Sequence, residues 1–177
     1  MAPARLGFRC TRCGQCCRTH RVPLTDADLK RLIDATGLGE EQIVEWLSPL
    51  EIDMTGEPET FVELRAGRRL MTLAWRDDGC RFLEDDGACS VHAARPAACA
   101  AFPYALEQGS LELLPLGVCE PGWDGPADPA PWHASCEQLE RELESYVERV
   151  AEHNRRQRRL RLAGRSAEER MRRPESE

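Results

Sequence analysis

The sequence predicts a small, irregular α+β domain with short helices, a β-hairpin and a long C-terminal helix. Three observations predict it: two short amphipathic segments before residue 50, an alternating segment interrupted by Gly, and an apolar stripe of helical period after residue 133. The chain has 177 residues, enough for one domain with its own core plus tails.

The first half of the chain contains two expected helices. Thr25 or Asp26 can cap the first helix, and Gly37 is a suitable C-terminal stop. Residues 39–50 place apolar side chains on one side at helical spacing, so we expect a second short helix that Pro49 ends.

Strands and the long helix follow. Residues 60–75 read as two strands joined by a turn at Ala66–Gly67, and residues 110–118 as a short or edge strand because they contain Pro115. From His133 an apolar stripe predicts a helix to about residue 160. Cys136 lies on this stripe, which favours a buried, inert thiol.

Charge is divided unevenly along the chain. Residues 155–177 hold nine Arg against four Glu, a net of +5, whereas residues 1–154 hold 15 basic against 27 acidic residues, a net of −12. An acidic body repels phosphates, so only the Arg-rich tail is an expected contact for nucleic acid. For this tail, a solvated helix end is favoured over a contact with RNA, DNA or a protein partner. An unknown protein partner stays open.

Neither a membrane span nor a secretory leader is expected. No apolar run approaches the ~20 residues of a spanning helix, and no apolar segment precedes the first cysteine. We therefore expect a cytoplasmic protein, in which clustered cysteines favour a metal over disulfides.

The stretch "CTRCGQCC" places four cysteines in eight positions, Cys10, Cys13, Cys16 and Cys17. Gaps of two residues let a loop bring several thiolates to one centre, as in tetrahedral zinc sites and iron–sulfur clusters. Cys17 either serves a second centre or binds the same one with local strain, because neighbouring side chains usually diverge.

A second group contains Cys80, Cys89, Cys99 and Cys119. The eight cysteines allow two four-thiolate sites, or one centre with further thiols nearby. His92, three residues after Cys89, is either a ligand or a hydrogen-bonding neighbour of the centre. The fold is therefore predicted to be built around a cysteine-ligated metal centre.

The stretches "FRCTRCGQCC" and "CRFLEDDGACSVHAARPAACAAFP", with a later Cys119, resemble the YkgJ-type cysteine-cluster family, described as a zinc- or iron-chelating domain. The resemblance spans roughly residues 8 to 120. It implies a metal-binding domain. Family members often carry Arg directly after the cysteine at position 99, where this chain has Ala100, so a cation is not expected there.

The cysteine spacing suits both an iron–sulfur cluster and zinc. The C-x-x-C-x-x-C spacing, with Cys17 nearby, resembles ferredoxin loops and favours a 4Fe–4S cluster. We expect electron transfer, redox sensing or an accessory role. The first alternative is a zinc-stapled structural or interaction module. A modifying enzyme of methyltransferase type is less favoured, because no catalytic constellation is recognisable.

These observations divide the chain into three parts. Residues 1–130 are expected to form the metal-binding domain and residues 131–162 an amphipathic helix packed on it. Residues 163–177 are predicted to be a disordered Arg-rich tail, because they contain almost no apolar side chains.

Overall fold

The structure is a computed structural model that describes residues 8, 10–52, 58–114 and 128–172. Its described part mixes helices with short antiparallel strands, which confirms the α+β class. The α-helices are α1 (Gln15–Thr19), α2 (Asp26–Thr36), α3 (Glu40–Ile43), α4 (Ala97–Ala101) and α5 (Ala130–Arg172). Two short 3₁₀ helices are η1 (Pro58–Thr60) and η2 (His92–Ala94).

The strands form three small antiparallel sheets. A three-stranded sheet has the order β1-β3-β2, and two further pairs are β4 with β5 and β6 with β7. The strands are β1 (Val44–Leu47), β2 (Val62–Leu64), β3 (Gly67–Leu73), β4 (Trp75–Arg76), β5 (Gly79–Cys80), β6 (Tyr104–Glu107) and β7 (Ser110–Leu113).

Helix α2 and the hairpin confirm two sequence predictions. The Thr25 side chain accepts a hydrogen bond from the Asp28 backbone N–H, the Asp28 side chain accepts from the Thr25 N–H, and Gly37 ends the helix in the left-handed region. In the hairpin, β2 pairs with β3 in a register that joins Leu64 to Gly67. Strand β7 lies within the predicted 110–118 segment, whose residues from 115 on are outside the described part.

The helix predicted over residues 39–50 is wrong after Ile43. Helix α3 ends there, and Val44–Leu47 form β1, which pairs with β3 from Val44↔Leu73 to Leu47↔Leu70. A short apolar segment fits either periodicity, and here the free edge of β3 supplies backbone partners that a second turn of helix would not use.

Two apolar clusters form the interior. The main core joins α2, the three-stranded sheet and α5, with Leu32, Ile43 and Met71 among its buried side chains. The second core lies where α5 begins, and contains Phe8, Ala101, Tyr104 and Cys136. Cys136 is 1% exposed, which confirms the predicted buried thiol.

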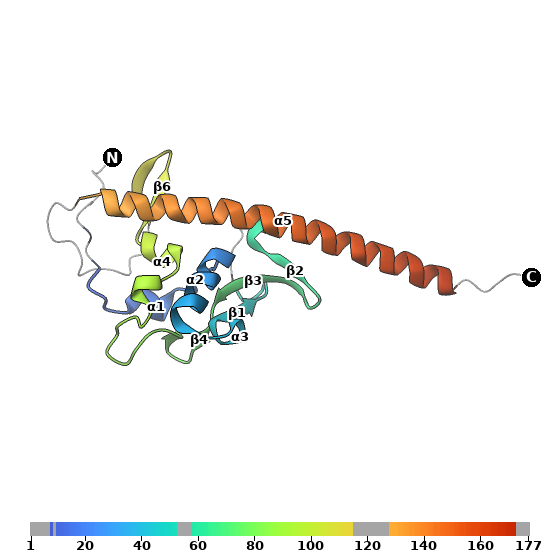
Figure 1. Cartoon of the computed structure of the whole chain (residues 1–177), viewed down its shortest axis with the longest axis horizontal. Helices are drawn as coiled ribbons and strands as arrows, with labels where there is room; N and C mark the ends of the chain where they lie inside the picture. The colour runs from blue at the N-terminus through green and yellow to red at the C-terminus, as the bar shows by residue number, and fades with distance from the viewer. Residues whose placement is uncertain (1–7, 9, 53–57, 115–127, 173–177) are drawn as a thin grey trace, which may run out of the picture.

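Helix α5 spans both cores. Figure 1 shows it crossing one side of the body, above α4, α2 and β2, and then extending beyond the body. The helix continues past the predicted end near residue 160. The backbone of residues 163–172 continues α5, in line with the high helix propensity of Arg, Ala and Glu. The disorder expected of the Arg-rich tail stays a prediction.

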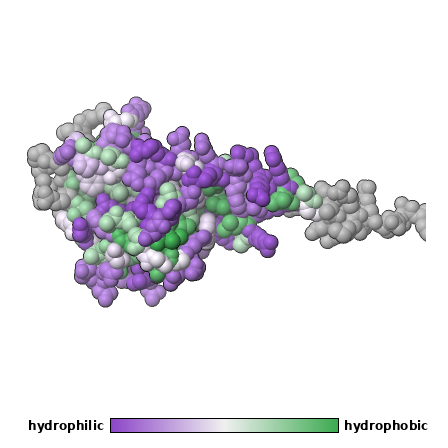
Figure 2. Space-filling view, viewed as in Figure 1, coloured by the Kyte–Doolittle hydropathy of each residue, from purple (hydrophilic) through white to green (hydrophobic). Residues whose placement is uncertain are grey.

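The face of the molecule shown in Figure 2 is largely hydrophilic. Figure 2 shows polar residues over most of one face, with small apolar patches over the body and along α5. Leu160 and Leu162 are 58% and 64% exposed on the projecting part of α5. In the described part of the chain, none of the helices combines the length and apolar character needed to cross a bilayer.

Asn154 fixes α5 to the hairpin, and its replacement tests this contact. Its side chain accepts a hydrogen bond from the Glu63 N–H at 2.7 Å and donates one to the Phe61 carbonyl at 2.8 Å, all in a buried setting. Asn154→Ala leaves both backbone groups unpaired, so we expect a loss of about 2 kcal/mol in the free energy of unfolding. Urea denaturation measures it.

The matched control is Arg156→Ala, on the same helix at an exposed position. It is expected to change the free energy of unfolding by less than about 0.5 kcal/mol. Equal losses in the two variants would show that the Asn154 contacts do not hold α5 to the hairpin.

Candidate metal centre

The cysteine-bearing segments meet at one side of the main core. Cys16 and Cys17 lie on α1, Cys80 on β5 and Cys99 on α4, while Cys89 forms an isolated bridge with Leu83. Cys80 is buried in the main core, and Cys17 and Cys89 pack against it. Three elements and one isolated bridge therefore present thiols to the same region.

Cys16 is the common neighbour of these thiols. Its Sγ lies 4.0 Å from the Sγ of Cys17. The hydrogen bond with Cys16 is the main cause that raises the pKa of Cys17. For Cys80, Cys89 and Cys99 the main cause is burial, and the charge of Cys16 adds to it, so all four thiols lie within the electrostatic range of Cys16.

The pKa shifts of the pair Cys16–Cys17 have opposite signs. A hydrogen bond from the Cys17 thiol lowers the pKa of Cys16 to about 7, and Arg95 contributes in the same direction. The same hydrogen bond, followed by burial, raises the pKa of Cys17. Cys16 is thus the thiol most easily converted to a thiolate, the form that binds metals.

Burial acts on the other thiols of the group. Desolvation is the main cause that raises the pKa of Cys80, Cys89 and Cys99. A metal that binds them must displace their protons, so its affinity is expected to rise with pH.

Cys10, Cys13 and Cys119 are placed differently. Cys10 and Cys13 are exposed, and Cys10 interacts electrostatically with Cys89. The structure gives no such contact for the Cys13 thiol, and Cys119 lies outside the described residues. The described cysteines are free thiols.

Thiols are suitable ligands for a soft metal, but the described thiols lie too far apart to coordinate one ion together. Among the described residues, no group of three His, Cys, Asp or Glu side chains is close enough to hold an ion as they stand. Cys16 and the four thiols within its electrostatic range nevertheless form a donor set that zinc and iron prefer.

Gly14 allows the first cysteine loop to contact the second. It has φ +73°, and a Cβ there would lie 2.8 Å from the Gly87 carbonyl oxygen and 2.8 Å from Leu83 Cδ1. A similar approach occurs at Gly79, where a Cβ would lie 2.8 Å from the Cys17 carbonyl oxygen. The close backbone contact therefore sets the distance between Cys16–Cys17 and the Cys80–Cys89 segment.

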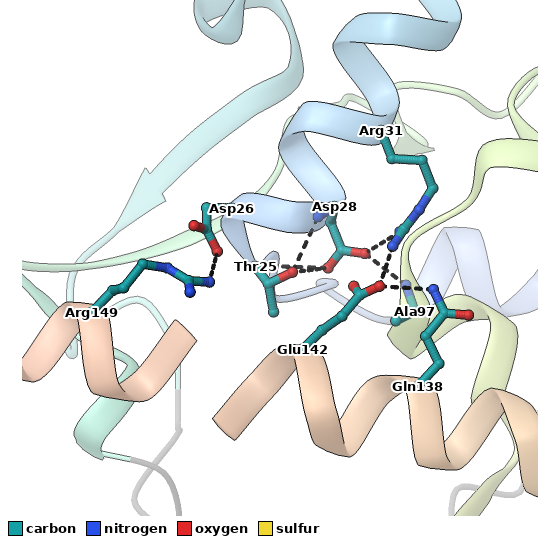
Figure 3. Close-up of polar contacts among 8 residues, drawn as sticks. All are labelled: Thr25, Asp26, Asp28, Arg31, Ala97, Gln138, Glu142 and Arg149. Atoms are coloured by element: carbon teal, nitrogen blue, oxygen red, sulfur yellow. Dashed lines mark hydrogen bonds and ion pairs between the residues drawn. The ribbon is translucent and has the colours of Figure 1, made fainter. Parts of the chain in front are cut away.

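Asp28 positions the helix that carries Cys99. Its side chain is 1% exposed and its Oδ1 accepts a hydrogen bond from the Ala97 N–H, at the first residue of α4, at 2.8 Å. The same oxygen accepts from Arg31 at 2.7 Å. Arg31 also pairs with Glu142 of α5, which accepts a further hydrogen bond from Gln138 (Figure 3).

Phe8 anchors the chain just before Cys10. Its ring is 4% exposed and packs against Tyr104 and Trp132 of the second core, at centroid distances of 6.4 and 5.4 Å. Sequence reasoning identified neither this anchor nor Asp28. The only sequence signals were an apolar residue before the cysteine comb and an acidic residue in a capping position.

His92 is directed to Arg95. Both ring nitrogens lie against the guanidinium, with Nδ1 3.2 Å from Nη1. Burial, followed by the charges of Arg95 and Arg12, lowers the pKa of His92. Of the two roles considered from sequence, this contact favours a neutral hydrogen-bonding neighbour over a ligand.

A thiol-rich α+β domain of this kind belongs to the class of cysteine-based metal-binding domains. The model of the CxxCxxCC family, described as a "putative zinc- or iron-chelating domain", matches residues 9–120. The chain belongs to this family, as the cysteine spacing predicted, and zinc or iron are the metals expected from it. No curated protein and no solved structure matches the chain.

Gly14→Ala tests the close contact between the cysteine loops. The new Cβ would meet the Gly87 carbonyl, so we expect the loops to separate and the metal bound per chain to fall by at least half. Elemental analysis of purified protein measures it.

Gly37→Ala is the matched control. Gly37 has a similar φ of +69°, but nothing lies within 4 Å of its Cβ position. Both variants pay the cost of a left-handed alanine, about 1 kcal/mol. Only Gly14→Ala is expected to lose metal, and equal metal contents would contradict the proposed role of the contact.

Asp28→Asn tests the positioning of α4. The amide is uncharged and its nitrogen cannot accept a hydrogen bond, so either Thr25 or Arg31 loses its acceptor. We therefore expect the free energy of unfolding to fall by roughly 3 kcal/mol. Asp34→Asn on the same helix breaks only the exposed pair with Lys30 and should cost less than about 1 kcal/mol. Similar losses in urea denaturation would show that Asp28 has no special role.

Proposed function

We propose that this domain holds an iron–sulfur cluster, of the 4Fe–4S type, and that it serves in electron transfer, redox sensing or as an accessory to another protein. The observation that supports this proposal is the grouping of thiols around Cys16. An iron–sulfur cluster is held by cysteine thiolates and supplies one-electron chemistry when bound.

The proposed ligands come from the thiols that lie around Cys16. Cys16 interacts electrostatically with Cys17, Cys80, Cys89 and Cys99, and Cys10 interacts with Cys89. This set exceeds the four thiolates of one cluster. We therefore propose that the ligands are drawn from it, together with Cys13 and Cys119 from the same motif.

The surroundings of the thiols support a redox role. Cys80, Cys17 and Cys89 lie at the edge of the main core, which lowers the local polarity. Arg95 acts on Cys16 and Cys89, whereas the Asp28 carboxylate acts on Cys99. Burial and nearby charge are two of the properties that set a cluster's reduction potential.

A zinc-stapled interaction module is the alternative. The thiols lie on both of the loops that touch at Gly14. A zinc ion bound by four thiolates would hold these two loops together without redox chemistry, which favours this alternative. The two proposals share the ligands and differ in the ion.

Anaerobic purification separates the two metals. If the first proposal is right, the protein is brown, absorbs broadly near ~400 nm and contains iron and sulfide. A colourless protein with stoichiometric zinc would exclude the first proposal and support the second.

Cysteine variants connect the metal to the residues. Cys16→Ala and Cys99→Ala are each expected to reduce bound metal by at least half. Cys136→Ala is the control, since this thiol is buried in the second core. A variant at Cys16 or Cys99 that keeps full metal content would remove that residue from the ligand set.

A further inference from the structure

A polar cavity lies next to the candidate metal centre. Its volume is about 400 Å³, within the range of small-molecule sites. It lies among α2, η2, α4 and α5, and its lining includes Arg31, His92, Arg95, Ala97, Ala100 and Gln138. The alanines of α4 leave room that longer side chains would fill.

Arg31 is already paired within this lining. It donates to Asp28 at 2.7 Å and to Glu142, and Gln138 donates to the same carboxylate of Glu142. The two acidic side chains near the cavity are therefore engaged by Arg31 (Figure 3). Neither of these two carboxylates forms an ion pair with the second guanidinium of the lining, that of Arg95.

Arg95 has donors to spare. Within the described residues it forms no ion pair with a carboxylate, and its side-chain contact is with the ring of His92. A guanidinium carries five N–H donors, and a neutral imidazole accepts only one hydrogen bond. The remaining donors form a planar fork that matches a carboxylate or a phosphate.

We propose that this cavity binds a small ligand through an oxyanion group, a carboxylate or a phosphate, with Arg95 as its main partner. His92 accepts from Arg95 and so orients the guanidinium. The small side chains of Ala97 and Ala100 make space for the rest of the ligand. The inference concerns a site beside the centre and does not depend on which metal the centre holds.

Calorimetric titration of the full-length, metal-loaded protein tests this site. The probes are inorganic phosphate and malonate, each at constant ionic strength, and they distinguish a phosphate from a carboxylate ligand. We expect millimolar binding of at least one probe and at least tenfold weaker binding by Arg95→Gln. Arg156→Gln makes the same charge change at an exposed position of α5 and should bind as the wild type does.

A second variant is needed because Arg95 interacts with Cys16, so the loss of Arg95 could itself reduce metal content. This variant is Ala100→Leu. This substitution fills the cavity without changing charge, so it should also abolish binding. Metal content is measured on every sample. Lost anion binding with unchanged metal supports the site.

Three results would overturn the inference. The first is that neither probe gives heat at concentrations up to 20-fold the expected dissociation constant of ~1 mM. The second is that the wild type and Ala100→Leu bind the probe equally well. The third is that Arg95→Gln and Arg156→Gln weaken binding equally. Each leaves the proposed metal function untouched, because the metal is assayed separately. Conversely, a protein that binds the probes but no metal would overturn only the proposed function.

Discussion

The buried carboxylate of Asp28 is the contact on which the arrangement of the helices depends. It caps its own helix by accepting from Thr25, receives Arg31, and accepts from the first backbone N–H of α4. Arg31 then reaches Glu142 on α5. A carboxylate that is 1% exposed is costly to bury unless these donors satisfy it, so the three helices must be placed together. Because α4 carries Cys99, the same network determines where that thiol lies.

The cysteine loops have little apolar interior of their own and take their positions from the second core and from contact with each other. Phe8 anchors the approach to Cys10 in the second core, and Gly14 and Gly79 let the first loop touch the second at backbone distance. The thiols are thus brought to one region by packing and close backbone contact, although not to coordination distance. A bound ion would supply the remaining free energy to close the loops, as in other proteins whose metal binding is coupled to folding.

Sequence patterns predicted the elements whose structure depends on interactions between residues close in the chain. The capped helix α2, the hairpin of β2 and β3 and the buried Cys136 follow from capping residues, alternation and an apolar stripe. Strand β1 could not be predicted, because its choice depends on the free edge of β3. Nor could the hydrogen bond from Ala97 to Asp28, which joins residues 69 apart in sequence. The cysteine spacing predicted that the thiols share a centre, which stays a prediction for the full set, whereas the central place of Cys16 among the described thiols required the tertiary fold.

The position of the thiols at the edge of the main core combines two requirements of a metal centre. Burial raises the pKa of Cys80, Cys89 and Cys99, so a metal that binds these thiols takes the place of their protons. Exposure of Cys10 and Cys13 keeps one side open to solvent. Arg95 contributes to both the thiol group and the neighbouring cavity, since it lowers the pKa of Cys16 and lines the cavity wall. Charge placed in that cavity would therefore act on the proposed centre through a single guanidinium.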